Sequence, residues 1–151
     1  MDNLTLRLSM GIERIAVLGA GQMGNGIAQV AACAGYDVVM IDIKQDYLDK
    51  GLAAIENSLS RVVKKERMTQ QEADEAISLI SISTEKIAAA DADLVVEAIP
   101  EIPELKFSTF AELDSICKPE SILASNTSSI SINAIADATN RPDRVDRKSV
   151  V

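Results

Sequence analysis

The most informative absence in this sequence is histidine, which does not occur among its 151 residues. Histidine is the commonest general base in enzymes, so its absence bears directly on any proton transfer that the chain could catalyse. Only two cysteines occur, Cys33 and Cys117, and they lie far apart in the sequence. We interpret both as small apolar residues in a reducing compartment rather than as a disulfide. We expect no metal site.

Long apolar runs are also missing. The runs present, such as those at 15–18 and 38–41, are far shorter than the ~20 residues that span a bilayer. The N-terminus lacks the apolar core of a signal peptide, so we expect a cytoplasmic protein without a membrane partner. The net charge of −8 argues against nucleic acid as a general partner. A content of 47% hydrophobic and 25% charged residues is typical of a globular protein.

What the sequence does contain is a regular alternation of short apolar strands and helices. Strands are predicted at 14–18, 37–41, 80–83, 93–99 and 121–125. Helices are predicted at 22–34, 46–65, 69–79, 103–116 and 131–138, with a brief helical turn at 84–90. Strands that are apolar on both faces and alternate with helices are typical of a parallel sheet covered on both sides. We therefore predict an α/β fold, a Rossmann-type doubly wound parallel sheet with a helical hairpin between its second and third strands.

A glycine-rich turn connects the first predicted strand to the first helix. The stretch LGAGQMGNG carries Gly19, Gly21 and Gly24 in the spacing G-x-G-x-x-G, which alone is a weak signal. Here, Gly19 permits the tight turn, Gly21 lets the backbone approach a pyrophosphate, and Gly24 allows close packing of helix and strand. Backbone N–H groups at the helix start, at Gln22 and Met23, then face the phosphates. The pattern predicts a dinucleotide site.

An acidic residue, Asp42, closes the second predicted strand. It stands about 20 residues after the glycine turn, where a carboxylate can accept both ribose hydroxyls. The same carboxylate would repel a 2′-phosphate, so we predict NAD rather than NADP, a preference that Lys44 softens without reversing. The alternative is a surface aspartate that merely ends a strand, but the order of strand, turn, helix, strand and acid favours the NAD site.

Over residues 12–145 the sequence resembles the N-terminal domain of the 3-hydroxyacyl-CoA dehydrogenases, including the short-chain 3-hydroxybutyryl-CoA enzymes. The resemblance rests on GAGQMGNGIAQVAA (19–32), DLVVEAIPE with ELK (93–101, 104–106), SNTSSISI (125–132) and RPDRV (141–145). The first stretch is shared with other nicotinamide enzymes, whereas the second and third together are more selective. The resemblance implies NAD-dependent oxidation of 3-hydroxyacyl-CoA to 3-oxoacyl-CoA, in fatty-acid β-oxidation or butanoate metabolism.

The resemblance also implies residues at the nicotinamide end of the cofactor. Glu101 and Lys106 would lie along the nicotinamide half of NAD. Taken by themselves, they look like solvated charges at a helix start. Asn126 and Ser128 would contact the cofactor from the crevice beyond the strand ends, and Ser128 would also bind the 3-oxygen of the substrate.

A purely structural role is the alternative for the serines of SNTSS. In that case Ser128 or Ser129 would cap the short helix that begins near Ser131. Both roles are compatible, with different members of the cluster serving each.

The tip of the predicted hairpin carries four basic residues, Arg61, Lys64, Lys65 and Arg67, on an otherwise acidic chain. A local positive patch can receive the phosphates of coenzyme A, and the resemblance implies CoA contacts at Ser58 and Lys65. Cations also suit the C-terminus of a helix, so a solvated helix end is the alternative.

Two features of the family find no counterpart in this sequence. The family uses a histidine base, oriented by a glutamate, on a strand just after RPDRV. Here the stretch DRKSVV at 146–151 lacks the apolar run of a sixth strand. The family's helical C-terminal domain, which forms the homodimer and much of the acyl pocket, is absent as well. We thus divide the chain into a leader or loose N-terminus at 1–11, an NAD-binding domain at 12–145 and an atypical tail at 146–151.

These absences lead to an expectation about activity. Loss of general-base catalysis typically lowers a rate by about 10²–10⁴, so we expect this chain alone to bind NAD but barely turn over. We also expect exposed apolar surface to permit self-association. A stand-alone NAD-binding module without catalysis, or another β-hydroxyacid dehydrogenase, is the alternative.

Overall fold

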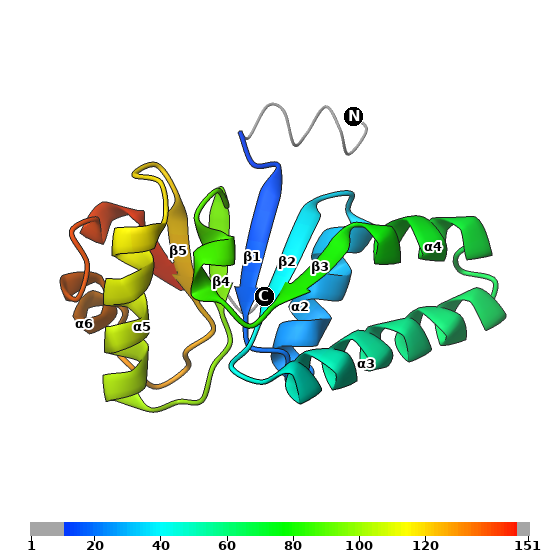
Figure 1. The fold of residues 1–151 in the computed structure, drawn as a ribbon, viewed down its shortest axis with the longest axis horizontal. Helices are drawn as coiled ribbons and strands as arrows, with labels where there is room; N and C mark the ends of the chain where they lie inside the picture. Colours follow the sequence, from blue (N-terminus) through cyan, green and yellow to red (C-terminus); the bar gives the residue numbers. More distant parts are fainter. Residues whose placement is uncertain (1–10, 148–151) are drawn as a thin grey trace.

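The computed structural model describes residues 11–147, and its fold is a single twisted sheet with helices on both faces (Figure 1). Within these residues six parallel strands pair in the order β3-β2-β1-β4-β5-β6. Their bounds are β1 Arg14–Leu18, β2 Asp37–Ile41, β3 Ile80–Ser83, β4 Leu94–Glu97, β5 Ile122–Ser125 and β6 Val145–Arg147. From β1 the chain adds β2 and β3 on one side and then β4, β5 and β6 on the other side. The point between β1 and β4 is therefore the switch point of a doubly wound sheet. The predicted Rossmann-type fold is confirmed.

The helices divide between the two faces of the sheet. The α-helices are α2 Gln22–Cys33, α3 Gln45–Lys64, α4 Gln70–Ser78, α5 Pro103–Ile116 and α6 Ile132–Asp137, and the 3₁₀ helices are η1 Lys86–Ala89 and η2 Pro142–Arg144. One core lies under α2, α3 and α4 and includes Val17, Met40 and Leu48. The other lies under η1, α5 and α6 and includes Phe110 and Leu123. Successive strand residues alternate between these two cores, as the pleat of a strand requires.

The predicted helical hairpin is formed by α3 and α4, which extend away from the sheet (Figure 1). Thr69 and Glu72 form a capping box at the start of α4. The Glu72 N–H donates to Thr69 Oγ1 at 3.1 Å, and the Thr69 N–H donates to Glu72 Oε1 at 3.1 Å. Two otherwise unpaired N–H groups are satisfied in this way, which explains why the second arm of the hairpin begins there.

The sixth strand is the main difference from the sequence-based expectation. The apolar run that would have predicted it is missing, yet β6 pairs in parallel with β5 from Val145 onward. The predicted end of the domain at Val145 therefore coincides with the first residue of a strand. Of the tail predicted at 146–151, residues 148–151 lie outside the described residues, as do residues 1–10 of the predicted N-terminal segment.

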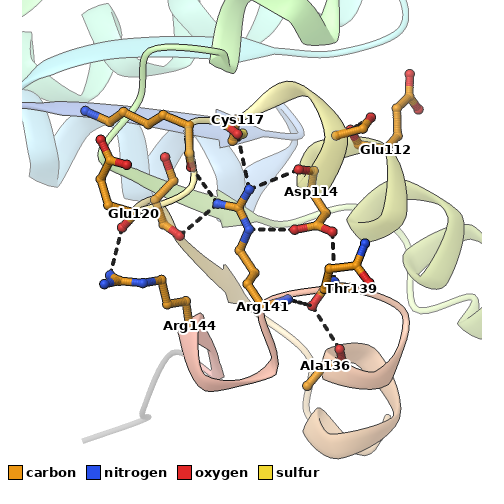
Figure 2. Close-up of polar contacts among 12 residues, drawn as sticks. Glu112, Asp114, Cys117, Glu120, Ala136, Thr139, Arg141 and Arg144 are labelled. Atoms are coloured by element: carbon orange, nitrogen blue, oxygen red, sulfur yellow. Dashed lines mark hydrogen bonds and ion pairs between the residues drawn. The ribbon is translucent and has the colours of Figure 1, made fainter.

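Arg141 anchors the segment that leads into β6 (Figure 2). Its side chain is 9% exposed, and Nε donates to Asp114 Oδ1 at 2.6 Å. Nη1 donates to the carbonyls of Lys118 and Ser121, and Nη2 to those of Asp114 and Cys117, at 2.7–3.2 Å. Every N–H donor of the guanidinium thus has an acceptor. The cation satisfies carbonyls at the C-terminal end of α5 and fixes the start of β5 against the entry to β6.

Within residues 11–147 no helix is long and apolar enough to cross a bilayer. The same part of the chain contains no group of three histidine, cysteine or acidic side chains arranged to hold a metal ion.

Candidate functional site

The glycine turn between β1 and α2 has the geometry that a dinucleotide requires. Gly19 has φ +106°, and a Cβ there would lie 2.5 Å from the carbonyl oxygen of Ala98. A Cβ on Gly24 would lie 1.8 Å from the carbonyl oxygen of Gly19, so neither position accepts a side chain. Gly21, the N-cap of α2, faces open space instead. The turn is therefore tightly packed on the protein side and open on the side where a pyrophosphate would approach.

The start of α2 supplies donors for an anion. No side chain caps this helix, and its first backbone bond within the helix joins the Asn25 N–H to the carbonyl of Gly21 at 2.9 Å. The N–H groups of Gln22 and Met23 precede that bond and have no acceptor one helical turn back. Together with the helix dipole, they favour negative charge at this end of the cleft.

Asp42 lies directly against the glycine turn. Its Oδ2 accepts from the Ala20 N–H at 2.8 Å and its Oδ1 from the Ile43 N–H at 2.7 Å. A carboxylate has about four lone-pair sites, so both oxygens can still accept from hydroxyl groups. An open cleft of about 660 Å³ is lined by Asp42, by the turn from Gly19 to Met23 and by residues 98–100 after β4. The cleft therefore lies at the carboxyl ends of β1, β2 and β4, where the sheet has its switch point.

A buried ion pair lies beside this cleft, at the ends of β4 and β5. Lys106 is 1% exposed and Glu97 is 0% exposed, and Lys106 Nζ lies 2.6 Å from Glu97 Oε2. The alternative interpretation of Lys106 as a solvated charge is therefore wrong. Its ammonium group also lies 3.7 Å from Glu101 Oε1, so Lys106 sits between an interior carboxylate and a partly exposed one.

Glu101 organises the loop after β5. The Thr127 hydroxyl donates to Glu101 Oε1, and the Ser128 N–H donates to Glu101 Oε2 at 3.3 Å. The hydrogen bond from Thr127, helped by the Ser128 N–H and the charge of Lys106, holds the pKa of Glu101 below its ordinary value despite partial burial. The structure thus brings Glu101, Lys106 and Ser128 together. Asn126 lies in the same loop, where its N–H donates to the carbonyl of Glu97 at 2.8 Å.

Comparison with known proteins identifies the family of this fold and cleft. Residues 14–147 match the family described as 3-hydroxyacyl-CoA dehydrogenase, NAD binding domain. The chain belongs to this family. Because the matching family is an NAD-binding domain, NAD is confirmed as the cofactor.

Individual relatives of the 3-hydroxyacyl-CoA dehydrogenase family agree with the match. The chain is 48% identical to 3-hydroxybutyryl-CoA dehydrogenase of Bradyrhizobium diazoefficiens, over 88% of this chain and 45% of that protein. It is also 48% identical to the probable 3-hydroxybutyryl-CoA dehydrogenase of Bacillus subtilis, over 90% of this chain and 47% of the relative. The crystal structure of (S)-3-hydroxybutyryl-CoA dehydrogenase from Ralstonia eutropha superposes with a TM-score of 0.87 at 42% identity, covering 89% of this chain and 47% of that one. The chain spans about half the length of the curated relatives it matches.

The capping role considered for the SNTSS serines belongs to a different residue in this family member. Ser131 is itself the N-cap of α6, and its Oγ accepts from the Ala134 N–H at 3.4 Å. The prediction that Ser128 or Ser129 caps this helix is therefore wrong. Ser128 instead lies exposed in the loop after β5, and its N–H donates to Glu101.

The predicted CoA contacts lie on the hairpin, away from the glycine turn (Figure 1). Ser58, on α3, is half-buried, and its Oγ accepts from Gln29 Nε2 of α2 at 3.0 Å. Lys65 is the exposed C-cap residue of α3, about two turns further on and thus on the same side of the helix. Glu66 follows it with φ +58° and turns the chain toward α4. The structure keeps these residues separate from the NAD cleft.

Two residues at the site were missed by sequence reasoning. Glu97 closes an apolar strand, and a charged residue in a buried strand is the signal that could have revealed it. Gly51 lies inside α3, where a Cβ would be 2.7 Å from the Ala20 carbonyl oxygen and 3.2 Å from Met40 Cε. A glycine inside a long helix, where alanine is favoured, is the corresponding signal. Both residues contact the parts of the site that the motifs identify.

Proposed function

We propose that this chain is the cofactor-binding half of an enzyme that oxidises 3-hydroxyacyl-CoA to 3-oxoacyl-CoA. The observation that carries the proposal is the contact of Glu101 with Thr127 and Ser128. This cluster lies on one side of the switch point of the sheet, and Asp42 lies on the other side, against the glycine turn. The glycine turn and Asp42 form a motif that many nicotinamide enzymes share, so they indicate a dinucleotide site but no particular substrate. The polar cluster after β5 is what favours a substrate that bears an oxygen to be held next to the nicotinamide.

The residues of the cleft fit NAD and divide it into parts. The open side of Gly21 leaves space for the pyrophosphate, and the N–H groups of Gln22 and Met23 offer it donors. Asp42 would hold the ribose of the adenosine. Because Asp42 follows β2, the adenosine half would lie toward that strand. The nicotinamide half would then extend over the ends of β4 and β5. The chemistry that bound NAD supplies there is acceptance of a hydride from C3 of the substrate.

Ser128 would orient the substrate in this scheme. Ser128 is exposed in the loop after β5, and its short hydroxyl side chain would donate to the 3-oxygen while leaving space for a ring and a carbonyl group. Glu101 would keep the loop in place through its bonds to Thr127 and to the Ser128 N–H. Asn126 would complete the nicotinamide end, and the buried Lys106 would act there through its contacts with Glu97 and Glu101.

We also propose that the chain on its own turns over very slowly. Glu101 is the carboxylate in contact with Ser128, and its lowered pKa makes it a weak general base at neutral pH. No histidine is available in this sequence to take the proton instead. We therefore expect binding with turnover reduced by about 10²–10⁴ relative to a family enzyme that has a histidine base.

The experiment combines an NAD titration with an assay of NADH oxidation by acetoacetyl-CoA. Binding of NAD and of acetoacetyl-CoA with very slow oxidation of NADH is the expected result. Turnover at the rate of complete family enzymes would contradict the proposed inactivity. NAD binding without any affinity for acetoacetyl-CoA would instead support a stand-alone binding module.

Coenzyme A is proposed to bind along the hairpin, with its phosphates near Lys65 and the other basic residues at the tip. The exposure of Lys65 and its position on the same side of α3 as Ser58 support this proposal. Lys65→Gln should weaken CoA binding more at low salt than at high salt. Affinity for pantetheine, which lacks the nucleotide phosphates, and affinity for NAD serve as internal controls and should not change. Self-association and a cytoplasmic location stay predictions, the first of which sedimentation can test.

A further inference from the structure

Helix α5 carries two buried ion pairs, one toward each end of the sheet. Near its start, Lys106 contacts Glu97 at 2.6 Å, with side chains 2% and 0% exposed. Near its end, Asp114 contacts Arg141 at 2.6 Å, with side chains 11% and 9% exposed (Figure 2). The first pair lies at the carboxyl ends of β4 and β5, beside the cofactor cleft, and the second lies at the amino end of β5. Burying a charge is unfavourable unless it is paired and hydrogen-bonded, so each pair needs a structural reason.

The carboxylate of Glu97 joins three elements of the fold. Glu97 is the last residue of β4, and its Oε1 accepts from the hydroxyl of Ser125, the last residue of β5, at 2.6 Å. Its Oε2 accepts from Lys106 Nζ of α5 at 2.6 Å and from the Ile99 N–H at 2.7 Å. Both oxygens thus accept hydrogen bonds from within the protein, and the buried side chain is inaccessible to any ligand.

Two routes lead from Glu97 to the polar loop after β5. Through Ser125, the same hydroxyl that donates to Glu97 accepts from the Thr127 N–H at 3.1 Å. Through Lys106, the ammonium group lies 3.7 Å from Glu101 Oε1, and Glu101 in turn accepts from the Thr127 hydroxyl. Glu97 therefore supports the loop through two sets of contacts, one through Ser125 and one through Lys106 and Glu101.

We propose that Glu97 is a positioning residue for the nicotinamide half of NAD, which it orients without touching it. The inference rests on the NAD-binding function described above. Asp42 and the start of α2 hold the adenosine and pyrophosphate portions, whereas the Glu97 network lies under the loop and the strand ends that remain for the nicotinamide. ADP-ribose contains the first portions and lacks the nicotinamide. The ratio of NAD affinity to ADP-ribose affinity therefore reports on Glu97, whereas ADP-ribose affinity alone does not.

The test compares Glu97→Gln with Asp114→Asn. Each variant replaces a buried carboxylate by an amide of nearly the same shape. In the wild type, each carboxylate belongs to an ion pair that joins α5 to a neighbouring segment. Dissociation constants for NAD and ADP-ribose are measured by calorimetry at a temperature where circular dichroism shows every variant to be folded. Glu97→Gln should lose about fivefold or more of NAD affinity and keep ADP-ribose affinity within about twofold, because hydrogen bonds to charged groups are worth more than neutral ones. Asp114→Asn should lower the melting temperature and leave both affinities within about twofold of wild type.

Three outcomes would overturn the inference: unchanged NAD affinity in Glu97→Gln, equal losses for both ligands, or the same change of ratio in Asp114→Asn. If Glu97→Gln does not fold, Ser125→Ala decides the question, because it breaks one route and leaves the ion pair intact. It should give a smaller loss of NAD affinity with ADP-ribose binding unchanged, and an unaltered ratio would refute the inference. A wild-type chain that binds neither ligand would refute NAD binding itself, which distinguishes the two failures.

Discussion

Replacement of Gly51 by alanine tests how α3 bears on the cofactor turn. An added Cβ would lie 2.7 Å from the carbonyl oxygen of Ala20, 3.1 Å from its Cβ and 3.2 Å from Met40 Cε. Ala20 is also the residue whose N–H donates to Asp42 at 2.8 Å. The substitution therefore pushes a helix against the peptide that donates a hydrogen bond to Asp42, the acid proposed to bind the ribose.

The magnitude follows from two opposing effects. In an open helix interior, glycine to alanine stabilises a protein by about 1 kcal/mol. At Gly51 the nearest obstacle is backbone rather than the end of a flexible side chain, and overpacking of this kind destabilises by about 1–3 kcal/mol. We therefore expect a net loss of about 0–2 kcal/mol in the free energy of unfolding, instead of the usual gain. NAD affinity should fall by about three- to tenfold, since a shift of the turn misplaces both the donors and Asp42.

The matched control is Gly26→Ala in α2, where an added Cβ has nothing within 4 Å. Urea unfolding gives the stability of both variants, and calorimetry gives their NAD affinity. Gly26→Ala should be as stable as wild type or more so, with unchanged NAD affinity. If Gly51→Ala matches Gly26→Ala in both measurements, the close approach of α3 to the turn has no consequence and the reasoning is refuted.

Three further predictions concern the remaining charged groups. Arg141→Met should lower the free energy of unfolding by about 3–5 kcal/mol in urea, because it leaves Asp114 buried without its cation; a loss below about 1 kcal/mol would mean that the pair behaves as an exposed one. Burial raises the pKa of Asp93, but hydrogen bonds from Lys118 and two backbone N–H groups, with the charge of Lys118, outweigh it and leave the pKa below its ordinary value. The resulting stabilisation is present above the ordinary carboxyl pKa of about 4 and is lost as the pH falls through the folded value. In Asp93→Asn, the free energy of unfolding should therefore fall less steeply than in wild type as the pH is lowered below about 4. An unchanged dependence on pH would show that Asp93 does not contribute this stabilisation. Asp42→Asn should narrow the preference for NAD over NADP by about tenfold or more, since it removes the charge that repels a 2′-phosphate; an unchanged ratio of the two affinities would exclude that role.

Much of the fold could be predicted because its boundaries depend on local signals. The strands β1 and β2 are short apolar runs whose burial is determined by their own residues. Gly35, with φ +93°, ends α2 as expected of a residue just after a helix, and Pro103 begins α5 where its missing N–H does no harm. In contrast, β6 has no apolar run. It forms because β5 offers an edge and Arg141 fixes the approach to it, and neither contact can be read from neighbouring residues.

The site shows the same division between local and long-range signals. Gly19 and Asp42 could be predicted because spacing along the chain places them at a strand end and a turn. The importance of Glu97 and Gly51 depends on what packs against them from α5 and from the glycine turn. For Lys106, sequence alone suggested a solvated charge, and only the resemblance to a family suggested otherwise. Its burial against Glu97 is a product of the tertiary fold.

Isothermal titration of this chain with NAD measures the central claim most directly, namely that the N–H groups of α2 bind a diphosphate while Asp42 holds the adjoining ribose. The account predicts saturable binding of NAD and weaker binding of NADP to the folded protein. Absence of heat with either oxidised or reduced dinucleotide, from a sample shown to be folded by circular dichroism, would contradict it.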